Sequence, residues 1–182
     1  MRALSLILTF MTAPLSTTSA TEEAFPQTKA GDIEIKTIPA SRLIMAESNS
    51  GYFDANNGLF QPLFRYISQN DIKMTSPVEA EIDPGKMYFY IGRDAADRDF
   101  QSTRNVTVIE KKERIVASIG VRGGYSRKNF ENAQAELEAW LAKHPTHQAA
   151  GQARGVYWNG PFTPGFLKRF EVHIPVAPRK LE

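Results

Sequence analysis

Apolar side chains recur at helical spacing between residues 59 and 67. Residues three or four positions apart lie on the same side of an α-helix, so this spacing predicts an amphipathic helix that runs to about Gln69. The apolar face of this helix is bulky because it carries two phenylalanines. Five residues make up the face: Leu59, Phe60, Leu63, Phe64 and Ile67.

The segment after this helix combines β-type residues with a proline. Asn70 and Asp71 break the helical pattern, and Pro77 lies within a strand predicted over residues 74–82. Proline has no N–H to donate to a sheet ladder, so we expect this strand to lie at a sheet edge or to carry a bulge. An opened edge beside an apolar helix is a place where a flat apolar ligand could insert.

The same order of elements occurs twice along the chain. Short apolar and alternating segments predict further strands over residues 33–38, 43–48 and 87–91 and, beyond a polar loop, over 106–110, 115–121, 155–159 and 168–175. With a second helix in the later half, each half reads β-β-α-β-β. This repetition indicates an α+β fold in which two copies of one unit join their sheets, while a helix from each copy covers the outside.

The second helix is predicted over residues 126–143. Ser126 is a favourable N-cap residue, and Pro145 ends the helix because the residue before a proline is driven out of the α region. We expect Trp140 to belong to the core rather than to a ligand site. The predicted buried stripe consists of Phe130, Ala133, Leu137, Trp140 and Leu141.

Residues 1–20 have the features of a secretory signal peptide. Arg2 supplies a positive charge, an apolar run follows it, and small residues ending at Ala20 form a plausible cleavage site. The apolar run is shorter than the roughly 20 residues that span a bilayer. We therefore expect cleavage after Ala20, a periplasmic or secreted location, no stable membrane anchor, and a single domain over residues 21–182.

The composition narrows the classes of function. The 182-residue chain has no cysteine, which excludes disulfides, thiol catalysis and covalent haem attachment through Cys-x-x-Cys-His. The formal net charge is only +2, with both signs interspersed, and this argues against nucleic acid as the main partner.

Motifs for catalysis and metal binding are weak. The sequence has no Gly-x-Ser-x-Gly nucleophile elbow. His144 and His147 could suggest a metal pair, but Pro145 prevents the helix that would align them. His173 shares one face of a predicted strand with Glu171, and we expect it to be a solvated surface histidine rather than an iron ligand. These patterns indicate a protein that is not an enzyme and has no metal-ligating residues.

Three segments together resemble the SOUL haem-binding protein family. Residues 59–67 read Leu-Phe-x-Pro-Leu-Phe-x-Tyr-Ile, and residues 73–78 follow them as Lys-Met-Thr-Ser-Pro-Val. Gly-Gly-Tyr at 123–125 precedes the second helix, and Tyr-Trp-Asn-Gly-Pro-Phe at 157–162 precedes the last strand. The resemblance covers roughly residues 30 to 176. It implies a distorted antiparallel β-barrel flanked by two helices.

The resemblance also implies a ligand and a site. SOUL proteins bind tetrapyrroles in an apolar groove on the first helix, without a single shared axial histidine. Alignment on this helix and on the Met-Thr-x-Pro motif places Asn57, Phe60 and Phe64 at the groove-facing positions. Some relatives have methionine at the latter two, so phenylalanine keeps the apolar character here but loses any weak sulfur ligation.

From these observations we expect an exported protein that binds haem, non-covalently, or a related tetrapyrrole, as a carrier or buffer. Arg65, Lys168 and Arg169 are the nearest cationic candidates to pair with haem propionates, although each could equally be a solvated surface charge. The alternative is a binding module for another amphipathic molecule, because the duplicated plan also resembles bacterial effector-binding domains. Such sites usually present a buried carboxylate, which makes Glu79 and Glu81 the residues to examine.

Overall fold

The structure, a computed structural model, describes residues 21–54 and 58–179. Its first half contains β1 (Glu22–Glu23), β2 (Ile33–Ile38), β3 (Ser41–Glu47), α1 (Phe60–Gln69), β4 (Thr75–Ser76), β5 (Val78–Glu81) and β6 (Lys86–Tyr90). Its second half contains β7 (Thr107–Lys111), β8 (Arg114–Arg122), α2 (Arg127–Ala142), β9 (His147–Ala149), β10 (Arg154–Tyr157) and β11 (Arg169–Pro178). The predicted signal peptide, residues 1–20, lies outside the described residues.

The two halves join to form one curled antiparallel sheet. Its strand order is β2-β8-β11-β10-β5-β6-β3-β7, and β9 adds to the end of β11. The halves meet where β5 pairs with β10, with Val78 opposite Tyr157. The sheet is symmetric: its strand order reads the same from either edge when each strand is replaced by the equivalent strand of the other half. The predicted duplication and the α+β fold, a distorted antiparallel barrel flanked by two helices, are therefore confirmed, with the sheet curled into half a barrel.

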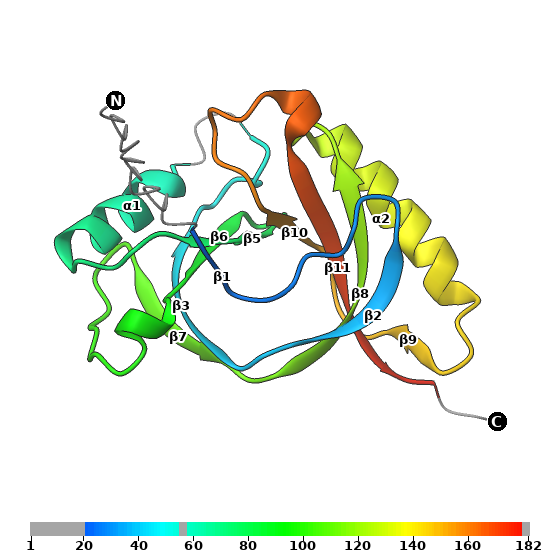
Figure 1. Cartoon of the computed structure of the whole chain (residues 1–182), viewed down its shortest axis with the longest axis horizontal. Coiled ribbons are helices and arrows are strands. Elements are labelled where there is room, and N and C mark those ends of the chain that lie inside the picture. The colour runs from blue at the N-terminus through cyan, green and yellow to red at the C-terminus, as the bar shows by residue number, and fades with distance from the viewer. Residues whose placement is uncertain (1–20, 55–57, 180–182) are drawn as a thin grey trace, which may run out of the picture.

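Figure 1 shows α1 and α2 on the outside of this curled sheet, one over each half. Each helix buries one stripe against the sheet: Leu63 and Ile67 from α1, and Phe130 and Leu137 from α2. The predicted N-cap of α2 is present, because the Ser126 side chain accepts a hydrogen bond from the Asn129 backbone N–H at 3.2 Å. No helix in the described residues is both long and apolar enough to cross a bilayer.

Pro77 does not place its strand at a sheet edge, so that one of the two expected alternatives is wrong. The segment is divided at the proline into β4 and β5, and β5 lies in the middle of the sheet between β6 and β10. Because Pro77 falls in the gap between the two strands, its missing N–H is not required by the ladder. β4 instead pairs in parallel with β1, through Glu22 opposite Thr75.

An N-terminal strap (residues 24–32) closes the inner side of the curled sheet (Figure 1). The sequence pattern did not predict this strap. The Phe25 ring lies 5.4 Å from the ring of Trp158, and the Thr28 backbone N–H donates to the Glu171 carboxylate at 2.8 Å. The strap passes so close to β8 that a side chain at Gly120 would collide with its carbonyl oxygens. The inner face is therefore buried, although it carries charged residues.

His173 is consequently not a surface histidine, and that expectation is wrong. The sequence pattern places it correctly on the same face of β11 as Glu171, but the strap covers this face and leaves His173 2% exposed. Its Nε2 lies 2.6 Å from Glu171 Oε2. Burial lowers the pKa of His173 despite the favourable carboxylate, so the imidazole is neutral in the folded protein.

Candidate ligand-binding cleft

A cleft of about 660 Å³ opens on the outer face of the sheet, beside α1 and over the junction of the two halves. One wall comes from α1, the floor from β5, β6 and β10, and the remaining walls from the segment after Trp158 and from Tyr125. The lining is mainly aromatic and apolar. It includes Tyr52, Phe60, Phe64, Met74, Val78, Met87, Tyr125, Tyr157, Trp158, Phe162 and Lys168.

Phe60 and Phe64 are exposed although they belong to the apolar pattern of α1. Phe60 is 38% exposed and Phe64 is 47% exposed, whereas Leu63, between them in sequence, is fully buried. Residues 60 and 64 are one helical turn apart, so their rings stack with centroids 5.6 Å apart. The helix thus turns one apolar stripe into the core and presents a second stripe, of two phenylalanines, to the cleft.

Three tyrosines lie under and beside the cleft. The rings of Tyr52 and Tyr157 stack with centroids 5.4 Å apart, and Tyr125 lies 4.7 Å from Tyr157. Burial raises the pKa of all three phenols, that of Tyr125 to about 12. They remain protonated near neutral pH, so the cleft offers flat neutral rings rather than a phenolate.

Met74 and Met87 also line the cleft, and the sequence reasoning did not assign them to it. Met74 is 36% exposed, whereas Met87 is buried. Met74 belongs to the Met-Thr-x-Pro motif, which was the available signal. Here the two thioethers come from the segment before β4 and from β6, not from α1.

The structure brings together only some of the predicted site residues. Phe60, Phe64 and Lys168 line the cleft, and the ammonium of Lys168 lies 4.8 Å from the centroid of the Tyr125 ring. Arg65 lines a separate, smaller depression on the far side of α1, and Arg169 is exposed at the start of β11. Asn57 lies outside the described residues.

The histidines lie away from the cleft. His144 and His147 pack against each other beyond the end of α2, with ring centroids 5.3 Å apart, and His173 lies behind the strap. Among the described residues, no group of three or more His, Cys, Asp or Glu side chains could hold a metal ion. A haem in this cleft would therefore be held by its apolar macrocycle, with Met74 as the accessible sulfur.

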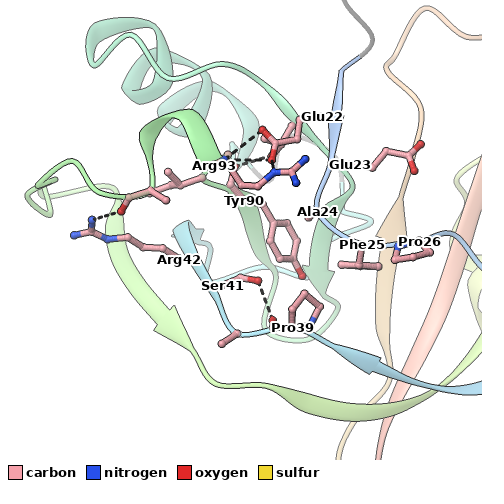
Figure 2. Close-up of a pocket in the computed structure, with 15 residues that line it drawn as sticks. Glu22, Glu23, Ala24, Phe25, Pro26, Pro39, Ser41, Arg42, Tyr90 and Arg93 are labelled. Atoms are coloured by element: carbon pink, nitrogen blue, oxygen red, sulfur yellow. Dashed lines mark hydrogen bonds and ion pairs between the residues drawn. The ribbon is translucent and has the colours of Figure 1, made fainter.

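A second pocket of about 640 Å³ lies at the N-terminal edge, between β1, the strap, β3 and β6 (Figure 2). Its charged side chains are already engaged. Arg93 Nε lies 2.9 Å from Glu22 Oε1, and Glu23 accepts a hydrogen bond from Gln27. Arg42 donates to the carbonyl oxygen of Ala96. This pocket lacks the stacked aromatic wall that distinguishes the outer cleft.

The carboxylates considered for an effector site face away from the cleft. Glu79 is buried on the inner face, where Lys111, Arg114 and Arg154 lie within 3.1 Å of its oxygens. Burial alone would raise the pKa of Glu79, but these cations lower it below its usual range. Glu81 pairs with Arg154 at 2.9 Å. Neither carboxylate lines the cleft.

The model of the SOUL heme-binding protein family matches residues 11–175, which is nearly the whole chain. The chain belongs to the SOUL family. A sequence comparison with curated proteins found no match.

Solved structures that resemble this SOUL protein show the fold alone, because their sequence identity is low. The C-terminal domain of EcmrR superposes with a TM-score of 0.63 at 15% identity, over 80% of this chain and 97% of that domain. In the EcmrR–DNA complex the TM-score is 0.62, and the chain spans only 57% of the length of EcmrR. A hydrolase from Listeria innocua gives a TM-score of 0.57 at 10% identity, over 82% of this chain and 94% of the hydrolase.

Proposed function

We propose that this SOUL protein binds haem or a related tetrapyrrole reversibly in the outer cleft, as a carrier or buffer rather than as a catalyst. The observation that carries the proposal is the exposed pair of stacked phenylalanines, Phe60 and Phe64, on one wall of an aromatic cleft. Exposed aromatic pairs are unfavourable in water. In a family named for haem binding, a porphyrin is the flat apolar partner that they suit.

The energetics support reversible binding. Covering a few hundred Å² of apolar surface contributes several kcal/mol at about 25 cal/mol/Å². The loss of translational and rotational freedom removes much of this gain. Lys168 is the cation in the cleft that can pair with a propionate, and Met74 supplies a soft, weak ligand to iron. We therefore expect micromolar affinity, which suits a carrier.

A titration of the purified protein with haem, followed at the Soret band, tests this proposal. Mesoporphyrin serves as an iron-free control. We expect both compounds to saturate one site with affinities within about tenfold, or 1.4 kcal/mol, because the macrocycle supplies most of the interaction. Failure of both compounds to bind would refute the proposal. A haem affinity more than a hundredfold above that of mesoporphyrin would show that iron ligation dominates the binding.

The same proposal includes export. The charge, apolar run and small residues before Thr21 are those of a cleaved signal peptide. We expect the mature chain to begin at Thr21 and to lie in the periplasm or outside the cell. The intact mass of protein recovered from the exported fraction measures this directly. A mass that includes Met1 would contradict it.

A role as an effector-binding module for cationic molecules is less well supported. It would need a carboxylate in the cleft, but Glu79 and Glu81 point to the inner face and are engaged by Lys111, Arg114 and Arg154. The similarity to the EcmrR domain concerns the fold. Carriage of a tetrapyrrole is therefore the function that the cleft supports best.

A further inference from the structure

The segment between β10 and β11 exposes three large apolar side chains. Phe162 is 98% exposed, Phe166 is 73% exposed and Leu167 is 50% exposed. Single exposed apolar residues are ordinary on protein surfaces, but three within six residues of one segment concentrate apolar surface that water disfavours. Figure 1 shows this segment, drawn in orange, projecting at the top of the molecule beyond the start of β11.

The backbone of this docking loop (residues 160–168) is held in place by hydrogen bonds. The N–H of Thr163 donates to the carbonyl oxygen of Gly160 at 3.2 Å, and that of Leu167 donates to Pro164 at 2.9 Å. The carbonyl oxygen of Lys168 accepts from the N–H of Gly123 at 2.9 Å. The fold therefore positions the loop and directs its apolar side chains outward.

Two arginines lie beside the loop, and their positive charges face each other on neighbouring strands. Arg122 on β8 is directly opposite Arg169 on β11, and both are exposed. In the part of the chain that the structure describes, neither side chain forms an ion pair. Like charges directly opposite each other on a sheet are destabilising. An anion placed across the pair would remove this repulsion.

We propose that the docking loop binds the surface of an anionic lipid bilayer. Phe162, Phe166 and Leu167 enter the interfacial region, and Arg122 and Arg169 meet lipid phosphates. An apolar tip flanked by cations is the combination that binds anionic membranes peripherally. A protein partner fits less well, because a stable interface takes roughly 800 Å² from each partner, and three side chains on a projecting loop form too small a surface.

Docking would also place the outer cleft at the membrane. Phe162 and Lys168 belong both to the loop and to the lining of the cleft. The cleft would then open beside the apolar phase in which a tetrapyrrole dissolves. The docking itself does not depend on the proposed ligand, since its residues are exposed in the ligand-free protein.

Co-sedimentation of the ligand-free protein with vesicles tests the proposal. We expect binding to phosphatidylcholine vesicles that contain phosphatidylglycerol, weaker binding to pure phosphatidylcholine, and a decrease as salt is added. The double variants Phe162→Ser/Phe166→Ser and Arg122→Gln/Arg169→Gln should each bind at least about tenfold more weakly. The matched controls, Ile115→Ser and Lys112→Gln/Lys143→Gln, change exposed residues elsewhere and should bind as the parent does.

Three results would overturn the proposal. The parent protein could fail to bind either vesicle, or the loop variants could bind as tightly as the controls. The loop variants could also convert a dimer to a monomer in analytical ultracentrifugation, which would show that a second copy of the chain covers the patch. A Soret titration of Phe166→Ser keeps the two proposals separate, because Phe166 does not line the cleft and haem affinity should be unchanged.

Discussion

The two faces of the curled sheet differ in whether their side chains find partners within the protein. The inner face buries two carboxylates, and each is surrounded by partners. Glu171 accepts hydrogen bonds from the Thr28 backbone, from Ser118 and from the Trp158 indole, and it pairs with Lys36 at 2.6 Å. The outer face, although α1 and α2 cover most of it, leaves Phe60 and Phe64 partly exposed at the cleft. The two carboxylates of the inner face find their partners within the fold, whereas the aromatic rings of the cleft remain available to a ligand.

Buried charge is therefore a poor guide to the proposed ligand site of this protein. The pKa of Glu79 is strongly lowered, because three cations and the Tyr90 hydroxyl surround its carboxylate. Perturbed groups often mark functional sites, but ion-pair networks that hold a fold together perturb them equally. Here the cations come from β7, β8 and β10, so Glu79 fastens the two halves of the sheet together.

The largest effect is expected from Glu79→Gln. This change leaves Lys111, Arg114 and Arg154 near one another without their carboxylate, and breaking a buried ion pair costs about 3–5 kcal/mol. Urea unfolding should show a loss of that size. Glu131→Gln, an exposed site on α2, should change the free energy of unfolding by less than about 0.5 kcal/mol. Equal stability of the two variants would mean that the inner face does not fasten the fold.

The second prediction concerns pH. The pKa of His173 is lowered in the folded protein, so below about pH 6.5 the unfolded chain binds a proton that the folded chain does not. The free energy of unfolding should therefore fall between pH 7.5 and 5.5, by up to about 1.4 kcal/mol per pH unit. Urea midpoints measured across this range follow the change.

A further loss is expected in acid. Burial tends to raise the pKa of Glu171, but the partners His173 and Lys36 lower it to about 2. The stabilisation from this carboxylate is complete above the unfolded value of about 4.3 and disappears as pH falls towards 2. Stability that rises as pH falls from 7.5 to 5.5 would show that His173 is protonated in the folded protein, and stability that stays flat would show that its pKa is the same folded and unfolded.

The smallest effect is expected from His144 and His147, which are partly buried. His144→Ala and His147→Ala remove side chains that lie beyond the end of α2, away from the cleft. Haem affinity should stay within about threefold of the parent, or roughly 0.7 kcal/mol, in a Soret titration. A tenfold loss in either variant would place iron ligation outside the cleft.

The sequence predicted the outer face better than the inner one. Helical spacing grouped Phe60 with Leu63, and the family resemblance indicated that the phenylalanines face a groove. Spacing alone did not separate the buried stripe from the exposed one, because both are apolar. The separation depends on how α1 is rotated over the sheet, and this is set by packing against strands distant in sequence.

The inner face was misjudged for a related reason. Alternation placed His173 and Glu171 on one side of a strand correctly, and polar residues on one side usually face water. Here a strap of residues 24–32 covers that side, and its irregular backbone leaves no periodic signal. The strand after α1 was misjudged because a proline usually marks an edge. The gap at Pro77 instead allows β5 to remain central.

The substitution Phe64→Asp tests most directly whether the outer cleft is the ligand site. Phe64 is nearly half exposed, so in the ligand-free protein the carboxylate can stay hydrated and the thermal melt should be close to that of the parent. Haem would have to bury that charge, so affinity should fall at least tenfold, or about 1.4 kcal/mol. Ile115→Asp, at an equally exposed apolar site elsewhere, should change neither quantity appreciably. A ligand-free Phe64→Asp protein that melts far below the parent, or one that binds haem as tightly, would contradict the account.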